Sequence, residues 1–96
     1  MSRNEAIAVE MLNEIDRARS GSLKLDELEE RLWRLLDAVD ETFPNILAGR
    51  VENLVGELRE LQRENIAFAG GRLVDENQGA EVIYNEVCAA IGRYVA

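Results

Sequence analysis

Two segments of the chain place apolar residues at alternating spacings of three and four. In the segment 25–39 these residues are Leu25, Leu28, Leu32, Leu35 and Val39. In the segment 47–61 they are Leu47, Val51, Leu54, Leu58 and Leu61. Because an α-helix turns once in about 3.6 residues, this spacing puts each set on one face of a helix, as at the seam of a bundle. The chain is therefore expected to fold by packing amphipathic helices against one another.

The same periodicity predicts four helices, over residues 3–20, 25–40, 44–65 and 80–94. The chain has 96 residues, which is the size of one domain rather than two. Short connections between helices favour antiparallel neighbours. The predicted architecture is an all-α, antiparallel four-helix bundle that forms a single domain over residues 1–96.

The expected helix starts carry recognisable cap residues. Ser2 and Glu5 have the spacing of a capping box, in which each side chain bonds to the backbone amide of the other residue. For the second helix the N-cap is either Lys24 or Ser22, and lysine is a poor cap because it has no acceptor. Pro44 suits the first turn of the third helix, where its missing N–H costs nothing.

Residues 66–79 lack a clear helical period. The pair Gly70 and Gly71 allows a short hairpin. A two-stranded hairpin on its own is only marginally stable in water, so we expect a loop here instead.

The charge of the chain excludes several partners. It has 19 acidic and 11 basic residues, no histidine and a net charge of −8. Nucleic-acid backbones and anionic membrane surfaces attract lysine and arginine, so neither is expected as a partner. No apolar run approaches the roughly 18 residues that a membrane span needs, and no signal peptide opens the sequence. We expect a cytoplasmic protein.

Catalysis, cofactors and metals are not expected. Cys88 has no histidine to activate it and lies in the middle of an apolar face, as a small core residue does. Glu57 with Glu60, and Glu27 with Glu30, place carboxylates on adjacent turns. A carboxylate metal site in a bundle needs inward-facing glutamates, usually with histidine, and these residues flank the leucine stripes. They are interpreted as part of a solvated surface.

The second expected helix is the most acidic part of the chain. Residues 26–41 contain two basic residues and seven acidic ones, namely Asp26, Glu27, Glu29, Glu30, Asp37, Asp40 and Glu41. The basic residues, Arg31 and Arg34, lie four positions after Glu27 and Glu30, so two surface ion pairs are expected. The acidic density either serves solubility alone or steers a basic partner toward the helix.

Two apolar features add to this picture. Trp33, the only tryptophan, lies about 110° from the centre of the leucine stripe, where it either covers a neighbouring helix or anchors a partner. Near the C-terminus Ile91, Tyr94 and Val95 form an apolar group. Burial within the monomer is the first interpretation of that group, and a homodimer seam is the second.

The stretch Gly21-Ser-Leu23-Lys-Leu-Asp-Glu27-Leu28, together with the size and acidity of the chain, resembles small bacterial immunity proteins of the colicin D type. The likeness covers residues 21–32. Members of that family are acidic helical bundles that block a nuclease toxin by covering its basic active-site cleft. The resemblance implies a helical bundle with an acidic face that docks a basic protein.

We therefore expect a non-catalytic protein-binding module with a basic protein partner. Its expected binding residues are Asp26, Glu27, Glu29, Glu30, Trp33, Asp37 and Asp40. The alternative is a homo-oligomeric structural domain whose exposed apolar surface, including Trp33, closes on a second copy.

Overall fold

Four helices make up most of the chain. In the computed structural model, which describes residues 2–67 and 76–96, they are α1 (Arg3–Arg19), α2 (Leu25–Ala38), α3 (Asn45–Ala67) and α4 (Glu76–Val95). The expected all-α architecture with four helices is confirmed. No described helix is long and apolar enough to cross a membrane.

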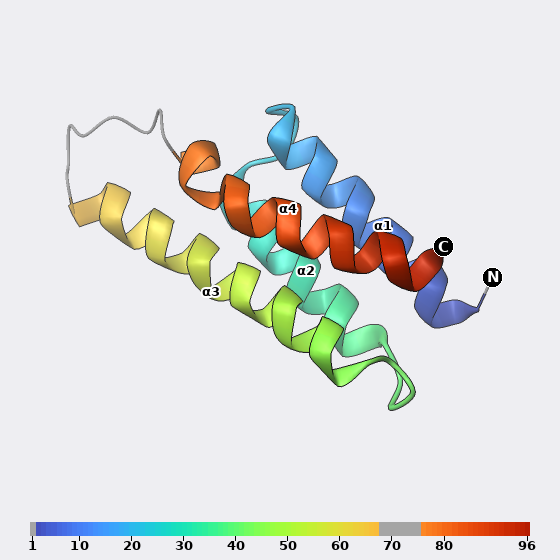
Figure 1. Cartoon of the computed structure of the whole chain (residues 1–96). Helices are drawn as coiled ribbons and strands as arrows, with labels where there is room; N and C mark the ends of the chain where they lie inside the picture. The colour runs from blue at the N-terminus through green and yellow to red at the C-terminus, as the bar shows by residue number, and fades with distance from the viewer. Residues whose placement is uncertain (1, 68–75) are drawn as a thin grey trace.

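The helices form a closed ring of contacts. α1 packs on α2 and α4, and α3 packs on the same two helices. In Figure 1 the chain reverses direction from each helix to the next. The side-chain contacts agree with this reversal for α1 and α2. Asn4, at the start of α1, contacts Asp40 just after α2, whereas Glu14, farther along α1, contacts the earlier residue Arg31. At the far end of α1, Arg19 binds the side chains of α4.

One hydrophobic core fills the centre of the ring. Its fully or almost fully buried members come from all four helices and include Met11, Ile15, Leu28, Leu32, Leu54, Leu58, Tyr84 and Ile91. The two periodic stripes supply much of this core. Leu35, Val39 and Leu61, at the ends of the stripes, are half-buried against it.

The helix starts follow the predicted cap chemistry in part. The amide of Glu5 donates to Ser2 Oγ and the amide of Ser2 donates to Glu5 Oε1, both at 3.1 Å, so the predicted capping box is present. Lys24 takes the N-cap position of α2, and the alternative cap, Ser22, is wrong. Only half of a box can form there, with the Lys24 amide donating to Glu27 Oε1 at 3.2 Å.

The connections between the first three helices are short. Gly21 has a positive φ of 85°, a backbone conformation that side chains with a Cβ rarely adopt, and it lies just beyond the end of α1. The carbonyl of Pro44 accepts a 3.0 Å bond from the amide of Ala48. Pro44 is therefore the residue before α3 rather than its first residue, a shift of one position from the prediction.

The helices flanking the third connection are longer than predicted. α3 continues through Ala67, and α4 begins at Glu76, four residues before the expected start. The loop predicted for residues 66–79 is therefore wrong at both ends, and so is a hairpin that begins at residue 66. Glycine inside a helix costs only about 1 kcal/mol relative to alanine, so the first turn of α4 can include Gly79. The remainder of the predicted loop, residues 68–75, lies outside the described residues.

Candidate functional site

The outer surface of α2 carries a line of four exposed residues, Asp26, Glu30, Trp33 and Asp37, which we call the acidic stripe. Their spacings of four, three and four place them within about 60° of one another around the helix. The buried Leu28 and Leu32 lie on the other side of α2. One aromatic side chain thus lies in a row with three carboxylates on a surface that faces away from the core.

Trp33 is partly covered by a neighbouring helix and partly exposed to solvent. Its side chain is 45% exposed. The guanidinium carbon of Arg59, on α3, lies 5.8 Å from the centre of the indole ring, within the range of a cation–π contact. The two sequence-based interpretations of Trp33 therefore combine, because one part of the ring contacts a neighbouring helix and the rest faces solvent.

Glu29 holds the arginine that contacts Trp33. Its Oε2 accepts a 2.8 Å hydrogen bond from Arg59 Nε, and its Oε1 accepts a 3.1 Å bond from Gln62 Nε2. The carboxylate is only 23% exposed. Both oxygens of Glu29 are thus engaged by α3, where the carboxylate positions Arg59.

The expected ion pairs of α2 are half confirmed. Glu30 pairs with Arg34 at 2.6 Å, as predicted. Arg31 does not pair with Glu27, and its Nη1 instead lies 3.3 Å from the nearer carboxylate oxygen of Glu14 on α1. Glu14 is 4% exposed, and a buried carboxylate attracts a guanidinium more strongly than a solvated one does.

Asp40 belongs to the connection between α2 and α3 rather than to the acidic stripe. Its Oδ1 accepts bonds from Thr42 Oγ1 at 2.5 Å, Asn4 Nδ2 at 2.8 Å and the Thr42 amide at 2.9 Å. These bonds, that of the Thr42 hydroxyl foremost, hold the pKa of Asp40 below its ordinary value. Although Asp40 is exposed, its carboxylate stabilises a turn, so its expected role in partner binding has no geometric support.

Sequence reasoning missed Arg59 and Gln62, which fix the surroundings of Trp33. They lie 30 and 33 positions from Glu29. No local spacing signals a contact across that distance, because it depends on how α3 is aligned along α2.

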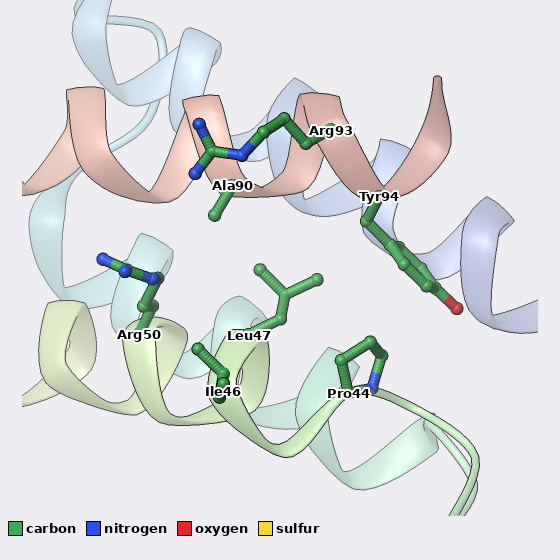
Figure 2. Close-up of a pocket in the computed structure, with 7 residues that line it drawn as sticks. All are labelled: Pro44, Ile46, Leu47, Arg50, Ala90, Arg93 and Tyr94. Carbon is green, nitrogen blue, oxygen red and sulfur yellow. The ribbon is translucent and has the colours of Figure 1, made fainter.

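A second surface lies between the start of α3 and the end of α4. It is a groove of about 330 Å³ lined by Pro44, Ile46, Leu47, Arg50, Ala90, Arg93 and Tyr94 (Figure 2). Ile46 is 77% exposed there. Sequence reasoning singled out neither Arg50 nor Arg93.

The apolar group near the C-terminus is mostly packed within the monomer, as first interpreted. Ile91 is fully buried, whereas Tyr94 and Val95 are half-buried. The ring of Tyr94 meets that of Phe43 edge-on, with 5.4 Å between centroids.

Cys88 is half-buried and packs against the core, so it is less enclosed than expected. Its burial raises the pKa of the thiol, which disfavours the reactive thiolate. Among the residues that the structure describes, no group of three or more carboxylate or thiol side chains is placed to hold a metal ion. No family model, curated protein or solved structure matches the chain.

Proposed function

We propose that the chain is a non-catalytic protein-binding module that docks a basic protein on the acidic stripe. The observation that carries this proposal is the placement of Trp33. The ring is half-exposed, is held by Arg59, and lies among three exposed carboxylates.

The Trp33 ring has the properties of an interface anchor. Tryptophan is enriched among the few residues that dominate binding energy. Ordering a mobile side chain opposes association, and that cost falls when the side chain is already held in place. The chain of contacts from Gln62 and Glu29 through Arg59 restrains the ring before any partner arrives.

The charges around Trp33 define the chemistry of the partner. Asp26 and Asp37 are exposed, and they add to a net charge of −8 that attracts cationic surfaces from a distance. Glu30 pairs with Arg34, but both side chains are more than half exposed and such a pair is worth little. A lysine or arginine of the partner can therefore replace Arg34. The partner that fits is a basic protein with an apolar pocket for the indole ring.

The resemblance of residues 21–32 to colicin D-type immunity proteins suggests a specific form of this function. In that form the acidic stripe would cover the basic cleft of a nuclease toxin and neutralise it. The carboxylates would occupy positions that otherwise receive phosphate groups.

The test compares two triple variants, each of which removes three negative charges from a different part of the surface. The stripe variant is Asp26→Asn, Glu30→Gln and Asp37→Asn, and the control variant is Asp16→Asn, Glu52→Gln and Glu57→Gln, at exposed positions of α1 and α3. The wild type and each variant are used to capture proteins from the source cell. A captured basic protein is then purified and titrated into each of them while Trp33 fluorescence is recorded. A nuclease partner is also assayed for inhibition.

We expect the wild type and the control variant to bind the same basic protein, with an affinity that falls as salt rises. The stripe variant should lose most of this binding, and Trp33→Ala, which lacks the fluorophore, should capture little of the basic protein. Equal binding by the stripe and control variants, or binding that salt leaves unchanged, would contradict the proposal.

The alternative is a homo-oligomeric structural domain, and exposed Ile46 in the α3–α4 groove is the observation that favours it. Light scattering over a dilution series separates the two. We expect a monomer of 10.8 kDa at every concentration, because Trp33 and Ile46 lie on different helices and the acidic stripes of two copies repel. A dimer that persists on dilution would favour the alternative.

A further inference from the structure

The groove between α3 and α4 combines an apolar floor with two cationic side chains. Leu47 and Ala90 lie between the helices, and Ile46 and Pro44 extend the apolar lining along α3 (Figure 2). In the same view the guanidinium groups of Arg50 and Arg93 lie at the end of the groove away from Pro44 and Tyr94. Arg50 comes from α3 and Arg93 from α4, so they stand on its two sides.

These two arginines are weakly engaged by the protein itself. Arg50 Nη1 is 4.0 Å from Glu86 Oε2, at the outer limit of an ion pair. Arg93 has no hydrogen-bond or ion-pair partner among the described residues. In a chain with eight more acidic than basic residues, this leaves a local site with unused donors for an anion.

The guanidinium groups suit a planar anion. Each presents N–H donors in a fixed fork that matches the two oxygens of a carboxylate. Glu86 is the carboxylate of the protein that competes for Arg50, and at 4.0 Å it leaves donors of that guanidinium free.

The apolar part of the groove limits the size of the ligand. The volume of the whole groove, about 330 Å³, is near the lower end of the range for small-molecule sites, and it is too small for an additional helix. The side chain of Ile46, 77% exposed, offers contact area that a hydrocarbon group would cover.

We propose that this groove binds a small organic carboxylate with an aryl or short alkyl group. The carboxylate lies between Arg50 and Arg93, and the hydrocarbon group packs on Leu47 and Ile46. The site uses α3 and α4 and shares no residue with the acidic stripe, so it is separate from the proposed docking surface.

The first experiment is an NMR titration of the full chain with 4-phenylbutanoate, in parallel with the neutral 4-phenylbutanamide at the same ionic strength. We expect saturable shifts for the acid at the backbone amides of Ile46, Leu47 and Ala90, and an affinity about tenfold lower for the amide. Absence of saturation, equal affinities for the two compounds, or shifts centred on α2 would overturn the proposal.

Three variants then test the arginines. Arg93→Gln should weaken binding of 4-phenylbutanoate about tenfold, since a charge-assisted pair is lost. Glu86→Gln should strengthen binding, because it removes the α4 carboxylate that pairs with Arg50. Arg34→Gln, which removes an exposed arginine of α2, is the matched control and should leave the affinity unchanged.

Arg93, Glu86 and Arg34 all have exposed side chains, so the helical fold should survive each change, and circular dichroism verifies this. An unchanged affinity in Arg93→Gln would overturn the proposal. So would an equal loss in Arg34→Gln, which would show that the acid responds only to the overall charge.

Discussion

The side-chain amide of Asn4 donates a 2.8 Å hydrogen bond to Oδ1 of Asp40, which joins the first turn of α1 to the connection between α2 and α3. The same nitrogen donates to Thr42 Oγ1 at 3.0 Å, and the side-chain oxygen Oδ1 of Asn4 accepts from the backbone amide of Asp40 at 3.2 Å. Asn4 is 4% exposed. One buried amide therefore fixes the position of α1 relative to two other helices.

Replacing Asn4 should destabilise the protein. We expect Asn4→Ala to lower the free energy of unfolding by about 1–3 kcal/mol, because three hydrogen bonds are lost at a buried position. Urea unfolding measures the change. Asn13→Ala, at an exposed position of the same helix, is the control and should shift the free energy by less than about 0.5 kcal/mol. Equal losses in the two variants would show that the Asn4 bonds contribute nothing specific.

Asp40 should make the stability depend on acid pH. Its hydrogen bonds favour the charged form and lower the pKa in the folded state, so the unfolded chain binds protons more readily. The contribution is present above the ordinary aspartate pKa of about 3.9 and is lost as the pH falls through the lower folded pKa.

The measurement is the urea midpoint at several pH values for the wild type and for Asp40→Asn. The variant should lose less stability than the wild type as the solution is acidified. Glu5, whose pKa is lowered by its bonds to Ser2, titrates in both proteins and sets the common background. Parallel curves for the two proteins would refute the role of Asp40.

The stability of the protein with Glu14 buried should depend on both of the arginines that pair with it. Its carboxylate side chain is 6% exposed and lies 3.3 Å from Arg31 and 3.4 Å from Arg17. Removing both partners with Arg17→Gln and Arg31→Gln leaves a buried charge without compensation, and we expect a loss of about 1–3 kcal/mol. In Glu14→Met, by contrast, both arginines remain solvated, and the change should be close to neutral.

Thermal or urea unfolding of these variants gives the order of stabilities. Arg34→Gln, whose glutamate partner is exposed, serves as the control for losing a surface arginine. If Glu14→Met were less stable than the double arginine variant, the carboxylate itself would be the stabilising group and this account of Glu14 would fail.

Arg59 should restrain Trp33. Because Trp33 is the only tryptophan, its fluorescence reports this site alone. We expect Arg59→Gln to increase quenching by acrylamide and to lower stability by about 0.5–1 kcal/mol, since the cation–π contact is lost. Arg50→Gln, on the part of α3 that lines the groove, is the control. Identical quenching in the wild type and Arg59→Gln would mean that the arginine does not hold the ring.

Local sequence patterns predicted the helices because helix formation depends on neighbours in the chain. The spacing from Leu25 to Val39 identified the buried side of α2, and the same geometry places Asp26, Glu30 and Asp37 on the outer side. The predicted start of α4 was four residues too late because residues 76–79, which include Gly79, show no clear helical period, whereas the helix tolerates them.

The roles of single acidic residues could not be predicted in the same way. Glu29 and Asp40 belong to the acidic segment that was expected to bind a partner. Their hydrogen-bond partners within the protein, Arg59 and Asn4, lie 30 and 36 positions away. The partner of Arg31 is likewise Glu14, 17 positions earlier, rather than the nearby Glu27. Each of these contacts requires the alignment of two helices, which no spacing within one helix contains.

Lys24, the N-cap of α2, is the only lysine in the chain, and it is exposed. A lysine-specific protease therefore has one cleavage site, which separates α1 from the other three helices. Met11 and Ile15 are fully buried on the inner face of α1, so the fragments 1–24 and 25–96 would each expose their own part of a shared core. A single cut would turn this bundle into a complementation pair, in which a one-helix peptide restores the fold only by binding its three-helix acceptor.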